Sequence, residues 1–190
     1  GGGTRLKSVE RRRGRLARWL DREGQRAAGL LEREPPSAFG AAARRLLGVL
    51  AEGGAPLRRR FDAIELATPQ FPVLLDVHRE HLLMVGERVT GLIDPAAART
   101  DTLAADLARL AVSLEPGRLP GLITAYRTVR TFSETEAALA ELLYDSGALL
   151  SGLAWVARGL WEGEATARSP AAIARMTHFA HVAERALSHG

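Results

Sequence analysis

Apolar residues recur at helical spacing over most of the chain, and the breaks between the runs carry glycine or proline. In the amino-terminal third this pattern predicts helices at 8–32, 37–54 and 56–66, the first capped by Ser8 and the second ending at Gly53-Gly54. A Pro-Pro pair separates the first two helices. The segment before residue 68 is therefore predicted to be helical.

The carboxy-terminal half shows the same period. Ser133 with Glu136 three residues later is a capping-box signature. The helix that it opens is apolar around much of its circumference, which is typical of a buried helix, and Gly147 and Gly152 indicate close packing against another helix. In all, the predicted helices of this half are 102–114, 122–130, 134–161 and 170–187.

A different pattern lies between the helical segments. Two β-prone runs, 82–85 and 89–93, flank a short connection with Gly86, which predicts a β-hairpin. The expected fold class is mainly α with a small β-hairpin (α+β), in one domain over 1–190. Within it we expect a helical part (1–67), the hairpin part (68–101) and a second helical part (102–190).

Ionisable side chains gather at the two ends of the hairpin. Asp76 and His81 precede the first strand, and Asp94 follows the second. A hairpin brings its two ends together, so these side chains are expected at one edge. A lone Asp at a turn more often bonds its own backbone, and only the joint spacing indicates a site.

This order of residues resembles the catalytic segment of the aminoglycoside phosphotransferase and choline kinase-like superfamily. That string is His-Gly-Asp-x-His-x-x-Asn, then a hairpin ending in Ile-Asp, then an Asp shortly before Asp-Leu-Ala. Here Leu74-Leu75 replace His-Gly, and His81 replaces the metal-binding Asn. A bacterial branch with Asp-x-Trp-x-x-His is closer, with His78 in place of its Trp. The resemblance implies the carboxy-terminal lobe of a protein-kinase-like fold.

The resemblance also implies roles. Asp76 would accept or orient the proton of an attacking hydroxyl, and Asp94 would hold Mg²⁺ on ATP. His81 would bind metal through a ring nitrogen, orient Asp76 or touch phosphate, because Mg²⁺ prefers oxygen ligands. Asp106 would hold the backbone amides of the catalytic loop, and for Asp101 a helix N-cap is the leading account. His78 is expected near the site as a structural residue.

The second helical part is the acceptor side by the same resemblance. Asp145 and Trp155 are the candidates there, with a small-molecule hydroxyl compound as the acceptor. Aromatic residues at helical spacing are more often core residues, so a structural role for Trp155 stays open. The superfamily phosphorylates several kinds of alcohol, and the sequence does not identify one.

Composition narrows these expectations. The net charge is +4, and all but one of the 26 basic residues are Arg, without interleaved aromatics, so we expect no nucleic-acid partner. There is no cysteine, no secretory signal and no apolar run long enough for a membrane span, so a cytoplasmic protein without a membrane partner is expected.

The only lysine, Lys7, lies outside any strand-rich context, and no Gly-x-Gly-x-x-Gly sequence is present. An enzyme of this type clamps ATP with such elements. The chain is therefore expected to lack the nucleotide-binding lobe, which a separate segment would supply. Two alternatives stay open: a metal-dependent hydrolase using Asp76, His78, His81 and Asp94, and a non-catalytic helical interaction module.

Overall fold

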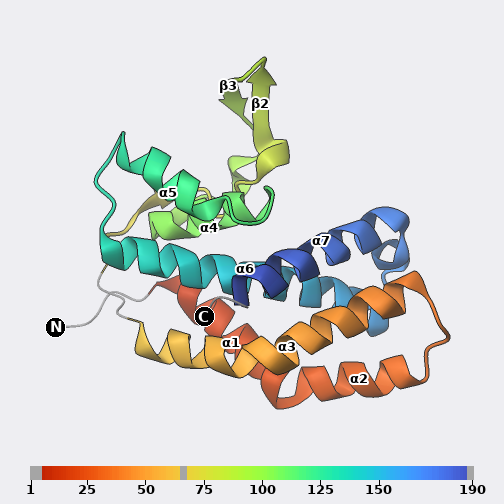
Figure 1. Cartoon of the computed structure of the whole chain (residues 1–190). Coiled ribbons are helices and arrows are strands. Elements are labelled where there is room, and N and C mark those ends of the chain that lie inside the picture. The colour runs from red at the N-terminus through yellow and green to blue at the C-terminus, as the bar shows by residue number, and fades with distance from the viewer. Residues whose placement is uncertain (1–5, 65–67, 188–190) are drawn as a thin grey trace. The chain divides into compact units, whose positions relative to one another are not determined.

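The computed structural model describes residues 6–64 and 68–187, which are mainly helical (Figure 1). The prediction of a mainly α fold with a small hairpin is confirmed. The helices are α1 (Lys7–Arg18), α2 (Gly24–Glu32), α3 (Ala38–Ala63), α4 (Leu103–Val112), α5 (Leu119–Arg127), α6 (Glu134–Leu160) and α7 (Pro170–Leu187). The strands are β1 (Phe71–Val73), β2 (Leu82–Val85), β3 (Arg88–Leu92) and β4 (Arg99–Asp101).

The chain forms two compact units. The first consists of residues 1–10 and 64–144, and the second of residues 11–63 and 145–190. The divisions fall within α1 and α6, so each unit is built from two separate stretches of sequence. None of the helices in the described stretches, 6–64 and 68–187, has the length and apolarity that a membrane span requires.

In the second unit, α3 runs without a break where two helices were predicted. Gly53 and Gly54 lie inside the helix, where both are buried and a side chain packs against each. A Cβ at Gly53 would lie 2.6 Å from Leu187 of α7, and one at Gly54 would lie 2.7 Å from Leu20. The glycines are thus explained by close packing. The last residues of the predicted helix 56–66 lie outside the described residues.

The first predicted helix is also modified. Its residues remain helical, but one π-helical turn, Trp19–Glu23, separates α1 from α2. Gly24 closes this turn by donating its N–H to the carbonyl oxygen of Trp19, five residues earlier. A Cβ at Gly24 would lie 2.8 Å from that oxygen, so only glycine fits without a shift.

Helix α6 begins and packs as predicted. Ser133 and Glu136 exchange the two bonds of a capping box, Ser133 N–H to Glu136 Oε2 at 2.8 Å and Glu136 N–H to Ser133 Oγ at 3.2 Å. In its second half, a Cβ at Gly152 would overlap the side chain of Leu46 in α3. The prediction that Gly152 marks close helix packing is confirmed.

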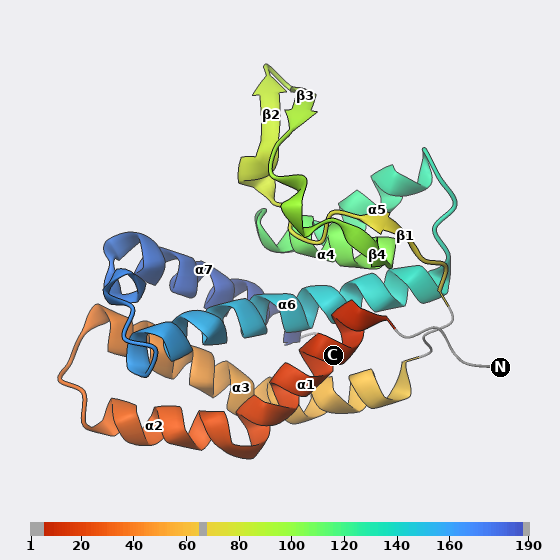
Figure 2. The same cartoon turned by 180° about the vertical axis from the view of Figure 1, so that it is seen from behind.

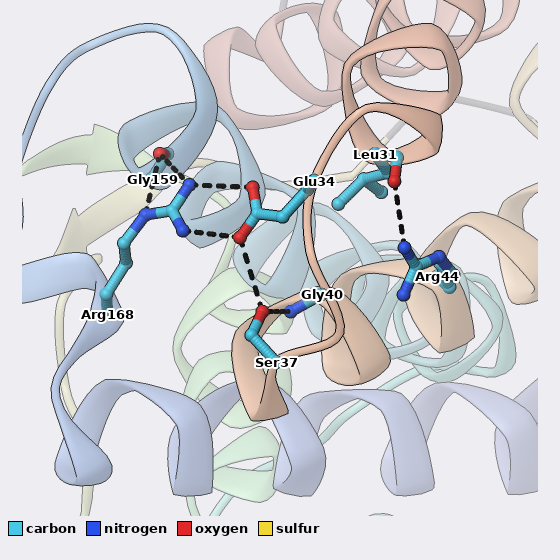
Figure 3. Close-up of polar contacts among 7 residues, drawn as sticks. All are labelled: Leu31, Glu34, Ser37, Gly40, Arg44, Gly159 and Arg168. Atoms are coloured by element: carbon cyan, nitrogen blue, oxygen red, sulfur yellow. Dashed lines mark hydrogen bonds and ion pairs between the residues drawn. The ribbon is translucent and has the colours of Figure 1, made fainter.

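Hydrogen bonds and an ion pair connect the ends of neighbouring helices in the second unit and form a polar clamp (Figure 3). Arg168, in the short 3₁₀ turn Ala165–Arg168, forms a two-pronged ion pair with Glu34 and donates to the carbonyl of Gly159. Ser37 donates to Glu34 and accepts from the N–H of Gly40 at the start of α3. The arrangement fixes the turn between α2 and α3.

In the first unit, the strands form two antiparallel ribbons, β1 with β4 and β2 with β3. The β2–β3 hairpin, with Gly86 at φ +60° in its turn, is the one predicted. The β1–β4 pair was not predicted. Figures 1 and 2 show the β2–β3 ribbon standing away from α4 and α5, while β1 and β4 run along α4.

Helices α4 and α5 follow the strands, and α5 lies three residues earlier than predicted at both ends. Thr102 caps α4 by accepting from Ala104 N–H at 3.3 Å. Helix α5 begins at Leu119, three residues before the predicted start, because Pro120 fits the first turn of a helix.

Candidate functional site

The site is built around the loop that follows β1. Asp106, in the first turn of α4, accepts hydrogen bonds from the backbone N–H of Leu74 at 2.9 Å and of Leu75 at 2.7 Å. These are the loop amides that the family resemblance assigned to Asp106. Burial raises the pKa of Asp106 and the charge of Asp101 adds to this, while the two amide bonds lower it.

The loop bends sharply just before Asp76. Leu75 has φ +62°, in the left-handed region that a side chain with a Cβ rarely adopts. Such a conformation costs on the order of 1 kcal/mol in a residue other than glycine. The family's usual string has Gly at this position, where this chain has Leu75.

Asp76 is held by an arginine that sequence reasoning missed. Arg109 of α4 donates from Nε at 3.1 Å and from Nη2 at 2.9 Å, both to Oδ1 of Asp76. The carboxylate is 47% exposed, and Oδ2 accepts no hydrogen bond from the described residues. Arg109 lies one helical turn after Asp106 on the same face of α4, and this spacing was the available signal.

Asp94 lies on the other connection between the two ribbons. Val73 pairs with Arg99 in the β1–β4 ribbon, and Leu82 pairs with Leu92 in the β2–β3 ribbon. Two segments therefore connect the ribbons, residues 74–81 and residues 93–98. Asp76 stands on the first connection and Asp94 on the second. Asp94 is exposed, with φ +56°, and its side chain does not cap the 3₁₀ turn Pro95–Ala97 that follows.

The two histidines lie at the foot of the hairpin. The carbonyl of His81 accepts the N–H of Ile93 at 3.0 Å, which places His81 beside the residue that precedes Asp94. The rings of His78 and His81 have centroids 3.6 Å apart. Nδ1 of His78 lies 2.7 Å from Oε2 of Glu80, and the His78 side chain is 20% exposed.

The described residues do not bring together the metal ligands that a metal-dependent hydrolase would need. Among residues 6–64 and 68–187, no group of three or more His, Asp or Glu side chains is placed to hold a metal ion. Mg²⁺ on a nucleotide needs less from the protein, because it is bound through one or two carboxylates with phosphates and waters as the other ligands. Asp94, an exposed carboxylate, is an oxygen donor of that kind.

Asp101 has a different role from the predicted cap. It is 1% exposed and accepts from Ser8 N–H at 2.9 Å, from Ser8 Oγ at 2.7 Å and from Thr102 N–H at 2.8 Å. The cap of α4 is Thr102, and Ser8 lies inside α1 instead of capping it. Asp101 thus ties the start of α1 to the end of β4.

The two candidate acceptor residues belong to the second unit. Asp145 is 7% exposed and pairs with Arg60 of α3 at 2.5 Å. Trp155 is half-buried, and the guanidinium of Arg158 lies 4.8 Å from its ring centroid. Both contacts are structural, and a role toward an acceptor stays a prediction.

Half-buried Asp106 thus ties the loop after β1 to α4, and Asp76 and Asp94 stand on the two connections between the ribbons. The chain belongs to the phosphotransferase enzyme family, which it matches over residues 3–142. The family resemblance stated from the sequence is therefore confirmed. No curated protein and no solved structure gives a significant match to the chain.

Proposed function

We propose that this chain is the catalytic lobe of a Mg²⁺- and ATP-dependent phosphotransferase that transfers the γ-phosphate to a hydroxyl group of a small molecule. Family membership supports a phosphotransferase. The observation that carries the proposal is the pair of hydrogen bonds from the Leu74 and Leu75 amides to Asp106, which orders the loop immediately before Asp76.

Each carboxylate has a separate task in this proposal. Arg109 engages Oδ1 of Asp76, so that Oδ2 orients the attacking hydroxyl and takes up its proton. Asp94 holds Mg²⁺, and the metal neutralises charge on the nucleotide phosphates when it is bound. His81 is the neighbour that orients Asp76 or touches phosphate, because a ring nitrogen is a poor Mg²⁺ ligand.

A separate β-rich lobe would clamp the nucleotide. The β2–β3 ribbon supports this part of the proposal, because it presents large apolar side chains to solvent: Val85 is 70% exposed, Val89 53% and Met84 50%. An apolar surface of this kind often marks an interaction site. The chain's only lysine, Lys7, is exposed on α1 and has no strand context.

The metal and nucleotide part is tested by calorimetric titration of the chain, together with a β-rich nucleotide-binding lobe supplied in trans, with ATP in Mg²⁺ and in EDTA. We expect binding that requires Mg²⁺ and is lost in Asp94→Asn. Asp21→Asn removes a 63% exposed carboxylate in the second unit and is the matched control. Metal binding without nucleotide would favour the hydrolase, and binding unaffected by Asp94→Asn would favour the interaction module.

The transfer step is tested with a β-rich nucleotide-binding lobe supplied in trans. Radiolabelled ATP is incubated with a panel of small alcohols, and labelled products are separated. Asp76→Asn should lower transfer by roughly a hundredfold or more, the usual contribution of a general base. Transfer at the wild-type rate in Asp76→Asn would overturn the role of Asp76.

A further inference from the structure

The second unit contains a polar pocket that the proposed phosphotransfer does not use. It has a volume of about 300 Å³. It lies between the last turns of α6 and the end of α1 with the π-helical turn that follows α1. Three arginines line it, Arg15, Arg18 and Arg158, together with Trp19 and Trp161. The arginines come from two helices far apart in the sequence.

Arg15 sits among like charges. It is half-buried, and its Nη2 donates to the backbone carbonyl of Leu150 at 3.2 Å. Burial lowers the pKa of Arg15, and the neighbouring charges of Arg11, Arg18 and Arg158 lower it further, while Glu23 acts in the opposite direction. A half-buried guanidinium with a carbonyl as its hydrogen-bond partner is an electrostatic cost that a bound anion would relieve.

The carboxylates of the pocket do not neutralise all three arginines. Glu23 pairs with Arg18 at 3.3 Å. Glu162, also at the pocket, is exposed, and among the described residues its carboxylate bonds none of the three. Arg158 has a long ion pair with Glu164, at 3.9 Å, and stacks on Trp155, while Arg15 forms no ion pair in the part of the chain that is described.

The backbone at the pocket is irregular. Trp19 and Glu23, both of which line it, are the first and last residues of the π-helical turn that Gly24 closes. A π turn breaks the regular helical hydrogen bonding, and such turns occur frequently at functional sites. The ring of Trp161 lies 5.7 Å from that of Trp19 by centroids, so the aromatic wall is continuous.

We propose that this pocket binds a small phosphate monoester. Guanidinium groups match phosphoryl oxygens with pairs of parallel N–H donors. A monoester carries about −1.5 to −2 charges at neutral pH, which matches the two guanidinium groups of Arg15 and Arg158. The site is independent of the loop at Asp76, because none of its residues belongs to the first unit.

The test is a calorimetric titration of the whole chain with glycerol 3-phosphate, without nucleotide. Succinate, a dicarboxylate of similar charge, and glycerol, without charge, are the ligand controls. Tryptophan emission gives a second readout, because Trp19 and Trp161 line the pocket and Trp155 is the remaining tryptophan. We expect saturable binding of glycerol 3-phosphate, weaker binding of succinate and none of glycerol.

Arg158→Gln removes one guanidinium and should weaken glycerol 3-phosphate binding by about tenfold or more, the effect of losing a charge-assisted hydrogen bond. Arg175→Gln makes the same change at an exposed position of α7 and should leave the affinity unchanged. If Arg158→Gln does not fold, Arg158→Lys keeps the charge without the planar fork and should still weaken binding.

Three outcomes would overturn the inference. They are equal affinity for succinate and glycerol 3-phosphate, no binding of glycerol 3-phosphate, and unchanged affinity in a folded Arg158 variant. None of them bears on Mg²⁺-dependent ATP binding, which is measured separately with Asp94→Asn. Failure of the phosphate site is therefore distinguishable from failure of the proposed phosphotransfer.

Discussion

Arg109 donates two hydrogen bonds to a single oxygen of Asp76, at 3.1 Å and 2.9 Å. The guanidinium therefore holds Oδ1 in place, while Oδ2 has no hydrogen-bond partner among the described residues. Arg109 also brings a positive charge to the site, on the helix whose first turn contains Asp106. The loop and helix α4 thus act as one polar unit, and its parts can be tested separately.

The first prediction concerns this pair. In the assembled enzyme, Arg109→Gln should lower kcat by about tenfold, because the lost charge-assisted bonds leave Asp76 less well oriented. KM for ATP should change little, since Arg109 is not expected to contact the nucleotide. The control Arg118→Gln removes an arginine that is 63% exposed and pairs with Glu115 in the same unit. An unchanged kcat in Arg109→Gln would show that Asp76 needs no such partner.

The second prediction concerns the anchor of the loop. Asp106→Asn keeps the shape of the side chain but presents an NH₂ group to one of the two loop amides. The free energy of unfolding should fall by about 1–3 kcal/mol, the usual cost of an unpaired buried group. Hydrogen exchange measured by NMR should accelerate at Leu74 and Leu75. Protected amides in Asp106→Asn would mean that the loop is ordered by other contacts.

The third prediction concerns the left-handed backbone at Leu75. Leu75→Gly should be more stable than Leu75→Ala by about 1 kcal/mol, because only glycine adopts a positive φ without strain. Leu122, half-buried inside α5, is the matched control, and there alanine should be the more stable by a similar amount. Chemical denaturation of the four variants measures both differences. The same order at both positions would contradict a strained Leu75.

Only part of this site was predictable from the sequence. The hairpin and the capping box at Ser133 could be predicted, because alternating apolar runs and local side-chain hydrogen bonds depend on neighbours in the sequence. Strand β4 could not be predicted, since Arg99–Asp101 is short and polar and forms a strand only by pairing with β1. The partner of Asp76 was missed for the same reason: Arg109 lies 33 residues away and meets it only in the fold.

The glycines of α3 show that a local sequence signal can also predict a helix end that the fold does not have. Gly53-Gly54 was interpreted as a helix end from local propensity, yet both residues are buried within the helix. Their small size allows Leu187 and Leu20 to approach the backbone, so tertiary packing overrides the local signal.

The fourth prediction concerns pH and the clamp of the second unit. The hydrogen bond from Arg168 lowers the pKa of Glu34, so the folded state favours the ionised form. The stabilisation is present above the unfolded pKa of about 4.3 and is lost as the pH falls through the lowered folded value. Glu34→Gln should therefore cost about 1 kcal/mol at neutral pH, given that Arg168 is partly exposed, and less in acid.

Urea unfolding of Glu34→Gln and of the parent at neutral pH and at about pH 3 measures this difference. Glu115→Gln is the control, because Glu115 is 77% exposed and its pair with Arg118 is a surface contact. Its effect should be small at both pH values. A cost of Glu34→Gln that does not change with pH would show that the ion pair is not its source.

The fifth prediction concerns the apolar β2–β3 ribbon as the contact for a nucleotide-binding lobe. Met84 and Val89 pair across the ribbon, and both are at least half exposed. Thr is β-branched and suited to a strand, so replacing both residues by Thr removes apolar surface without disfavouring the ribbon. Because the side chains are exposed in the lone chain, its stability should change by less than about 0.5 kcal/mol per substitution.

Affinity for the β-rich lobe should respond far more. Burying an aliphatic side chain of this size contributes roughly 1.5–3 kcal/mol, so the double variant should bind at least tenfold more weakly in a pull-down titration or by calorimetry. Val129→Thr is the control, since Val129 is 79% exposed in the same unit but follows α5. Equal affinities for the parent and the Met84→Thr/Val89→Thr variant would rule out the ribbon as the docking surface, because no other change separates the two proteins.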